Sequence, residues 1–147
     1  MTSATVLVAL VLSLPAVAFA DERCPWLNAA TAGGVLGGEA RVTVTAASCE
    51  FVHQEGAREV ILRIEVNEAS APHESCGSDA ETLKAIGNQA MGCRYEGKPG
   101  WSGEQVTGRV RDQAFLVRIV SNDRSATAKT LREKARKVAE QVAGILF

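Results

Sequence analysis

The residues best suited to chemistry in this sequence are four cysteines and two histidines. Redox catalysis favours a C-x-x-C motif, and metal binding favours closely spaced cysteine and histidine ligands. The cysteines here are widely separated, and no two of them lie closer than 17 positions. Their even number and wide spacing predict two structural disulfides among Cys24, Cys49, Cys76 and Cys93.

Three pairings of these cysteines are possible, and spacing alone does not decide between them. We favour Cys24 with Cys49 and Cys76 with Cys93, because each bond would then join a loop or a helix start to the following strand. If the thiols were free instead, metal or redox chemistry would have to be considered again.

The histidines are His53, beside a predicted strand, and His73, in a polar loop. A catalytic histidine would need a nucleophile and a carboxylate beside it. The sequence has no G-x-S-x-G motif, and His73-Glu74 is not followed by the second histidine of H-E-x-x-H. His53, His73 and Glu74 together would supply too few ligands for a metal site. The sequence therefore predicts no catalytic residue and no metal ligand.

Cofactor and nucleic-acid binding are also not indicated. The glycine pairs at 33–34 and 37–38 lack the spacing and flanks of a phosphate-binding loop or a dinucleotide fingerprint, so we expect no cofactor. The chain has 16 basic and 17 acidic residues and a formal net charge of -1. Nucleic-acid-binding domains usually carry a clear basic excess, so this balance argues against a dedicated nucleic-acid binder.

Four residues are candidates for binding. Trp101 lies in a glycine-rich loop over 97–103, where it is either an exposed anchor or folds back to cover the edge of the sheet. Arg109, Arg111 and Arg118 lie on one face of a predicted hairpin, as a patch facing a ligand or as ordinary solvated positions. A cell-envelope protein or a small anionic ligand would fit these residue types.

The hairpin is predicted from two alternating runs. A tight turn at Asp112-Gln113 pairs Arg111 with Ala114 and Thr107 with Arg118. One face then carries Val106, Gly108, Val110, Phe115, Val117 and Ile119. The opposite face carries Thr107, Arg109, Arg111 and Arg118.

Other patterns predict the remaining elements. Strands are expected at 41–45, 49–53 and 60–66, with a turn at 55–57, and another strand starts at 93–95. Helices are expected from a cap at Asn28 to 36, over 80–86, and over 126–146. The last helix has Asp123 and Ser125 as possible caps and an apolar stripe of Leu131, Ala135, Val138, Val142 and Ile145. The prediction is an α+β fold, an antiparallel sheet of five or six strands with a short N-terminal and a long C-terminal helix packed on it.

The first twenty residues resemble a secretory signal peptide. An uncharged stretch over 6–19 ends in Ala18-Phe19-Ala20, which matches an A-x-A cleavage site before Asp21. An uncleaved membrane anchor is the alternative, but about 14 apolar residues fall short of the roughly 20 that span a bilayer. We therefore expect residues 21–147 to form one secreted or periplasmic domain with no transmembrane segment.

Composition agrees with a folded domain. The chain has 147 residues, of which 46% are hydrophobic and 22% are charged, and this excludes a disordered, collagenous or polytopic membrane protein. Acidic residues are in excess over 21–96 and basic residues over 97–147. We favour internal complementarity between the two halves, although a site for an anionic partner is the alternative.

The order of several short motifs resembles small bacterial cell-envelope domains of unknown function. These motifs are Cys24-Pro25-Trp26-Leu27, Leu36-Gly37, Cys49-Glu50-Phe51, Ile86-Gly87-Asn88-Gln89-Ala90, the segments 106–110 and 115–119, and the Ala-rich final helix. Similar in general plan are actinobacterial envelope lipoproteins and the two-disulfide extracellular sensor domains of their receptor kinases, although this chain lacks a lipobox cysteine. The resemblance implies a disulfide-supported α+β binding or sensing module outside the cytoplasm, and it transfers no catalytic residue.

A non-enzymatic binding or sensing module is thus the leading functional hypothesis. An exported protein inhibitor or a structural component of the cell envelope is the alternative, and a hydrolase comes third because no nucleophile can be named. The ligand and the oligomeric state do not follow from the sequence.

Overall fold

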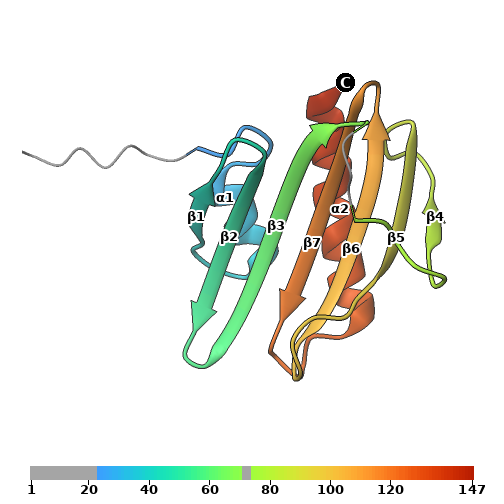
Figure 1. The fold of residues 1–147 in the computed structure, drawn as a ribbon. Helices are drawn as coiled ribbons and strands as arrows, with labels where there is room; N and C mark the ends of the chain where they lie inside the picture. The colour runs from blue at the N-terminus through green and yellow to red at the C-terminus, as the bar shows by residue number, and fades with distance from the viewer. Residues whose placement is uncertain (1–22, 71–73) are drawn as a thin grey trace, which may run out of the picture.

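The computed structural model describes residues 23–70 and 74–147, and it shows one antiparallel sheet with two helices (Figure 1). The elements in chain order are α1 (Ala29–Leu36), β1 (Arg41–Val44), β2 (Ser48–Glu55), β3 (Arg58–Glu68), β4 (Glu81–Leu83), β5 (Gln89–Tyr95), β6 (Ser102–Val110), β7 (Gln113–Ser121) and α2 (Ala128–Leu146). The strand order in the sheet is β1-β2-β3-β7-β6-β5-β4. The predicted signal peptide and His73 lie outside the described residues.

The α+β class, the antiparallel sheet and the two helices packed on it are confirmed, but the prediction of five or six strands is wrong. The sheet has seven strands. The additional strand is β4, which occupies part of the segment predicted as a helix over 80–86. Its three residues pair with 90–92 of β5, and Ala85 adopts a left-handed backbone with φ of 64° that ends any helix there. Pairing with a neighbouring strand has prevailed over a weak local helix preference.

The helix ends follow from capping side chains. The Asn28 side chain accepts a hydrogen bond from the Thr31 amide at 2.8 Å, as predicted, and the left-handed Gly37 ends α1. The predicted caps of the second helix are wrong. Thr127 caps α2 instead, while the Asp123 side chain accepts hydrogen bonds from Ser125 and closes a separate turn.

Both helices pack on the same face of the sheet, behind the strands in Figure 1. Leu131, Ala135, Val138 and Val142 of the predicted stripe are buried, whereas Ile145, near the end of the helix, is 57% exposed. From the strands, the core receives every second side chain, including Phe51, Leu62, Ile64, Val106, Val117 and Ile119. The other face has no helix, and we call it the open face.

The β6–β7 hairpin has a different register from the predicted one. The turn is at Arg111-Asp112, and Val110 pairs with Gln113. Arg111 has a left-handed φ of 54°, and its amide donates a hydrogen bond to the Asn88 side chain at 2.7 Å. Each pairing is therefore displaced by two positions along one strand. Side chains alternate with a period of two, so the predicted core face is still correct.

The disulfide pairing is the favoured one, Cys24–Cys49 and Cys76–Cys93. Two disulfides are typical of proteins that fold in an oxidising compartment. The first bond joins the segment before α1 to β2. The second fixes residues 74–80, which we call the strap, to the open face of β5. Among the described residues, no helix is long and apolar enough to cross a membrane.

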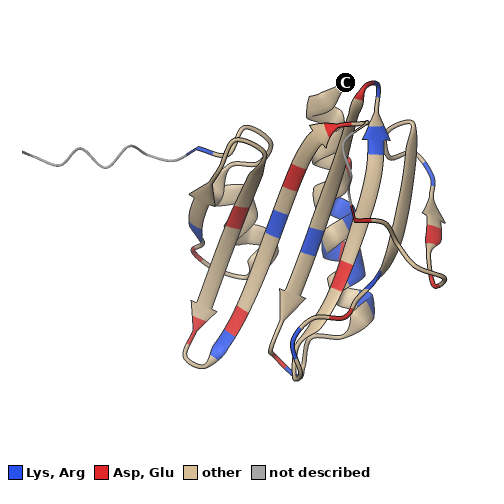
Figure 2. Ribbon diagram, in the orientation of Figure 1, with Lys and Arg blue, Asp and Glu red and all other residues tan. Residues whose placement is uncertain are grey.

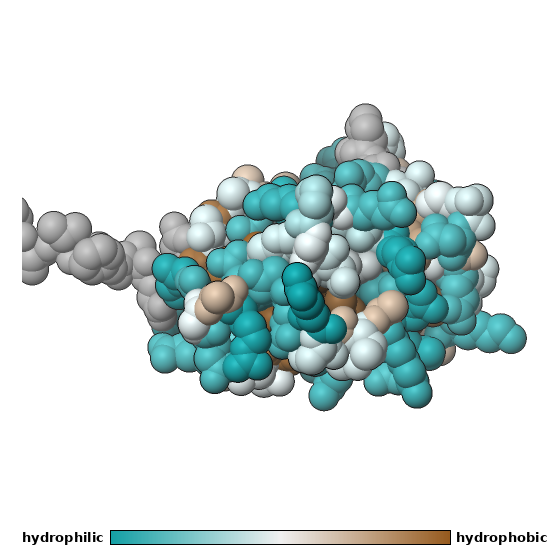
Figure 3. All heavy atoms as spheres, turned by 90° about the horizontal axis from the view of Figure 1, so that it is seen from below, coloured by the Kyte–Doolittle hydropathy of each residue, from teal (hydrophilic) through white to brown (hydrophobic). Residues whose placement is uncertain are grey.

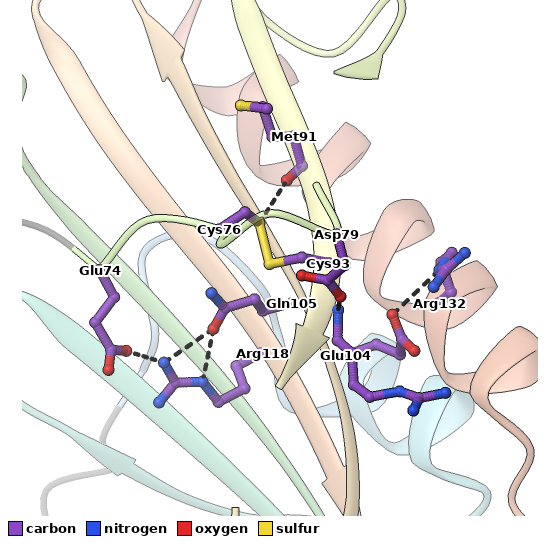
Figure 4. Close-up of a disulfide and its surroundings, with 10 residues drawn as sticks. Glu74, Cys76, Asp79, Met91, Cys93, Glu104, Gln105, Arg118 and Arg132 are labelled. Atoms are coloured by element: carbon purple, nitrogen blue, oxygen red, sulfur yellow. Dashed lines mark hydrogen bonds and ion pairs between the residues drawn. A yellow bond between two sulfur atoms is a disulfide. The ribbon is translucent and has the colours of Figure 1, made fainter. Parts of the chain in front are cut away.

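One carboxylate is buried on the helix side of the sheet. Glu104 of β6 is 1% exposed, and its Oε2 accepts a hydrogen bond from Arg132 Nε of α2 at 3.1 Å (Figure 4). Its Oε1 has no hydrogen-bond partner among the described residues. The hydrogen bond from Arg132 to Glu104, together with the negative charge of Glu104, raises the pKa of Arg132. This pair fixes the start of α2 to the sheet.

Replacing Arg132 with alanine should therefore destabilise the fold strongly. The substitution leaves a buried carboxylate with no partner, which should cost about 2–3 kcal/mol of unfolding free energy. Arg136→Ala is the matched control, because Arg136 pairs with the half-exposed Glu140 one turn further along α2. Its loss should cost about 0.5 kcal/mol or less. Urea unfolding of both variants measures the difference, and equal costs would contradict the role of Glu104.

Candidate functional site

The open face carries a row of polar side chains across the central strands. Glu50 of β2, Arg63 of β3, Arg118 of β7 and Gln105 of β6 are successive partners in the registers of the sheet. Arg63 and Arg118 are directly opposite each other, on the neighbouring strands β3 and β7 in Figure 2. Like charges at such positions are destabilising, so other groups must offset this repulsion.

The carboxylates around Arg63 supply part of that compensation. Arg63 Nε donates a hydrogen bond to Glu65 Oε1 at 2.5 Å, and its Nη1 lies 3.7 Å from Glu50 Oε2. The Arg63 side chain is 42% exposed, so water also screens its charge. Arg63 is thus a half-exposed cation held between two glutamates.

Arg118 is held in a more buried position, with its side chain 13% exposed. Its guanidinium donates to Gln105 Oε1 from both Nε and Nη2, at 3.2 and 3.0 Å. Nη2 also pairs with the Glu74 carboxylate of the strap, so that Glu74 and Gln105 approach Arg118 from two elements (Figure 4). The guanidinium carbon lies 3.8 Å from the centroid of the Tyr95 ring.

Burial lowers the pKa of Arg118, the charge of Glu65 opposes that shift, and the charge of Arg63 adds to it. An arginine guanidinium remains protonated at ordinary pH despite such a shift. Arg118 is therefore a fixed, partly desolvated positive charge in the middle of the open face.

The next row across the sheet is apolar. Ile61 of β3, Val120 of β7, Gly103 of β6 and Tyr95 of β5 are successive partners. A methyl group on Gly103 would lie 2.9 Å from Val120 Cγ1 and 3.0 Å from Tyr95 Cδ1. The missing side chain at Gly103 thus leaves room for the Tyr95 ring to lie near the sheet, next to Arg118.

The loop after β5 closes one side of this surface. Lys98 Nζ lies 5.7 Å from the centroid of the Trp101 ring, and the Trp101 amide donates a hydrogen bond to the Lys98 carbonyl at 3.0 Å. Trp101 is half-buried. The two aromatic side chains, the apolar row and the arginines enclose a hollow of about 180 Å³. Its lining carries three cations, Arg63, Lys98 and Arg118, and one carboxylate, Glu50.

The strap reaches Arg118, one of the residues that line this hollow, through the Glu74 carboxylate. Because the Glu74 carboxylate reaches β7 and Cys76 is bonded to β5, the strap crosses β6 on the open face. Gln105 and Leu116 are buried on this face, although no helix covers them. The strap thus divides the open face into a covered part and an accessible part, and Arg118 lies between the two.

The structure brings together two of the four predicted binding residues. Trp101 and Arg118 both line the hollow, with Trp101 folded against it. Arg109 and Arg111 are exposed near the β6–β7 turn, at the opposite end of β6 from the Trp101 loop. They do not line this hollow, because the chain runs the length of β6 between Trp101 and Arg111.

The charged and aromatic residues of the site that were not predicted from the sequence include Arg63, Glu74, Tyr95 and Lys98. Arg63 and Tyr95 occupy outward positions of predicted strands, where polar side chains are ordinary. Glu74 belongs to a loop with no periodic pattern. Lys98, three positions before Trp101 in a short glycine-rich loop, was the one signal that could have been used.

The other chemistry-bearing side chains in the part of the chain that the structure describes are its carboxylates, its disulfide-bonded cysteines and His53. No group of three or more His, Cys, Asp or Glu side chains there is placed to hold a metal ion. The His53 Nδ1 atom is 2.8 Å from the Glu39 carbonyl oxygen, so this ring connects the segment before β1 to β2.

Comparison with family models, curated proteins and solved structures finds no match to this chain.

Gly103→Ala should disturb the site and the fold together. The added methyl group would overlap Val120 and Tyr95, and such overpacking costs about 1–3 kcal/mol. We expect the ring signals of Tyr95, the only tyrosine in the chain, to shift in the NMR spectrum as the ring moves from Arg118. Gly34→Ala in α1 is the control, since a methyl group there meets no atom within 4 Å. This control should leave the Tyr95 signals unchanged. Equal shifts of the Tyr95 signals in both variants would contradict the role of Gly103 in making room for the Tyr95 ring.

Proposed function

We propose that this protein is an exported, non-enzymatic binding or sensing module, and that the hollow on the open face is its ligand site. The observation that carries the proposal is the convergence of three cations and two aromatic rings on one surface hollow. Ligand sites typically combine apolar walls with a few placed polar groups. This hollow has that composition.

The cost of the arrangement also supports a binding role. Packing alone does not require two arginines to be direct cross-strand partners, and a neutral pair at these positions would avoid their repulsion. Nor does stability require Arg118 to lose most of its hydration. Costly charge placements of this kind are more common at functional sites than elsewhere.

Export is proposed from the sequence, with the disulfides as further support. The A-x-A pattern at Ala18-Phe19-Ala20 predicts cleavage before Asp21. Four cysteines in two disulfides are consistent with an oxidising compartment such as the periplasm or the exterior.

An exported protein inhibitor or a structural envelope component is the second candidate. It is favoured by the two large apolar side chains that α2 leaves in solvent, Ile145 at 57% and Phe147 at 59% exposure. Figure 3, seen from the end of the sheet with the β2–β3 turn, shows a mainly hydrophilic surface where apolar residues form small separate patches. In that view there is no broad apolar surface for a protein partner.

The intact mass of the protein recovered from the exported fraction tests export. We expect a chain that begins at Asp21 and is four hydrogens lighter than its fully reduced form. A mass that retains residues 1–20 would contradict cleavage, and loss of a further mass on denaturation would identify a bound ligand.

Binding in the hollow can be tested with two neutral ring compounds, phenol and indole. We expect both to shift amide signals around the hollow in NMR titrations of the mature chain. Val120→Trp should abolish these shifts, because the indole ring would fill the hollow. Thr43→Trp, at an open-face position on the edge strand β1, should not abolish them. The proposal that the hollow is the binding site is contradicted if the amide shifts map to other parts of the chain, or if they persist in the Val120→Trp variant.

A further inference from the structure

We propose that the hollow binds an organic carboxylate carrying one ring-sized apolar group, and that the ligand carboxylate pairs with Arg118 in competition with the Glu74 carboxylate. This inference rests on the proposed function, and it specifies the chemical class of ligand for the same hollow.

The anion position is defined by Arg118. Its guanidinium already receives a carboxylate, that of Glu74, and is oriented by Gln105 and the Tyr95 ring. Its Nη1 atom has no acceptor among the described residues, whereas Nε and Nη2 are engaged. An arginine presents a planar fork of donors that matches a carboxylate, so a ligand carboxylate that bridges Nη1 and Nη2 would take the place of Glu74 on Nη2.

The charge of the lining favours an anion over a cation. Arg63, Lys98 and Arg118 face the hollow with Glu50 as the only carboxylate in the lining. Glu65 and Glu74 neutralise the arginines from outside it. A ligand carboxylate in place of Glu74 would keep Arg118 paired, while a ligand ammonium would face three cations.

Displacement of Glu74 should cost little. Its side chain is 62% exposed, and the ion pair to Arg118 is the one polar interaction that the structure gives for this side chain among the described residues. The released Glu74 carboxylate would be hydrated. Ion pairs made by exposed carboxylates contribute little to the stability of a fold, so its release should cost little. The strap would remain fixed by the Cys76–Cys93 disulfide and by the Arg94 amide, which donates to Asp79 Oδ2 at 3.1 Å.

The volume of the hollow limits the size of the ligand's apolar group. The hollow of about 180 Å³ is comparable to an engineered cavity of about 150 Å³ that accepts benzene. Ile61 and Val120 lie in the apolar row of the sheet, and Tyr95 and Trp101 supply aromatic walls. One ring fits this volume, with the carboxylate directed to Arg118.

The test compares benzoate, benzamide and acetate in NMR titrations of the mature chain. We expect benzoate to bind about tenfold or more tightly than either of the others, because benzamide lacks the charge and acetate lacks the ring. Glu74→Gln should tighten benzoate several-fold and leave benzamide unchanged. Arg118→Lys, which keeps the charge and loses the planar fork, should weaken benzoate about tenfold.

Glu81→Gln is the matched control for Glu74→Gln. Glu81 is 61% exposed and pairs with Arg132 on the helix side, so its replacement removes the same charge far from the hollow. Equal tightening by both variants would show a general charge effect and overturn the role of Glu74. Equal binding of benzoate and benzamide would overturn the carboxylate class, while phenol and indole binding in the hollow would still support the proposed function. If none of the five compounds binds, both proposals fail.

Discussion

The pairing of β3 with β7 is the constraint on which the rest of the structure depends. In the described sheet, two meanders, β1-β2-β3 and β4-β5-β6-β7, pair with each other through β3 and β7, in nine residue pairs between segments far apart in the chain. Because β7 occupies the place beside β3, the chain after β3 must cross the sheet to reach the edge where β4 lies. Helices occupy one face, so the strap crosses the open face.

This crossing explains both the second disulfide and the position of Arg118. A segment that runs over a sheet without strand pairing has few backbone partners of its own. The bond between Cys76 and Cys93 supplies one fixed point, and the Glu74–Arg118 ion pair supplies another. Arg118 thereby serves the fold and borders the hollow at the same time, which couples the strap to anything that binds there.

Charged side chains are paired differently on the two faces of the sheet. On the helix side, Glu104 is enclosed and depends on a single arginine from α2. On the open face, the arginines share several carboxylates that remain near water. Ion pairs also join the acidic and basic parts of the chain, as in Arg118–Glu74 and Arg132–Glu81, in line with the complementarity predicted between them.

The sequence by itself determined the elements whose signals are local. Alternation defined β3 and the core face of the last hairpin, and Asn28 marked the start of α1. The position of each cysteine relative to the following strand favoured the disulfide pairing that is found. Only the tertiary structure decided which strand lies beside β3, the turn residues of the last hairpin and the strand character of Glu81–Leu83. These features depend on partners distant in the chain, and no local pattern encodes them. The site has the same origin, because Arg63, Tyr95 and Arg118 belong to three separate strands that only the sheet order brings together.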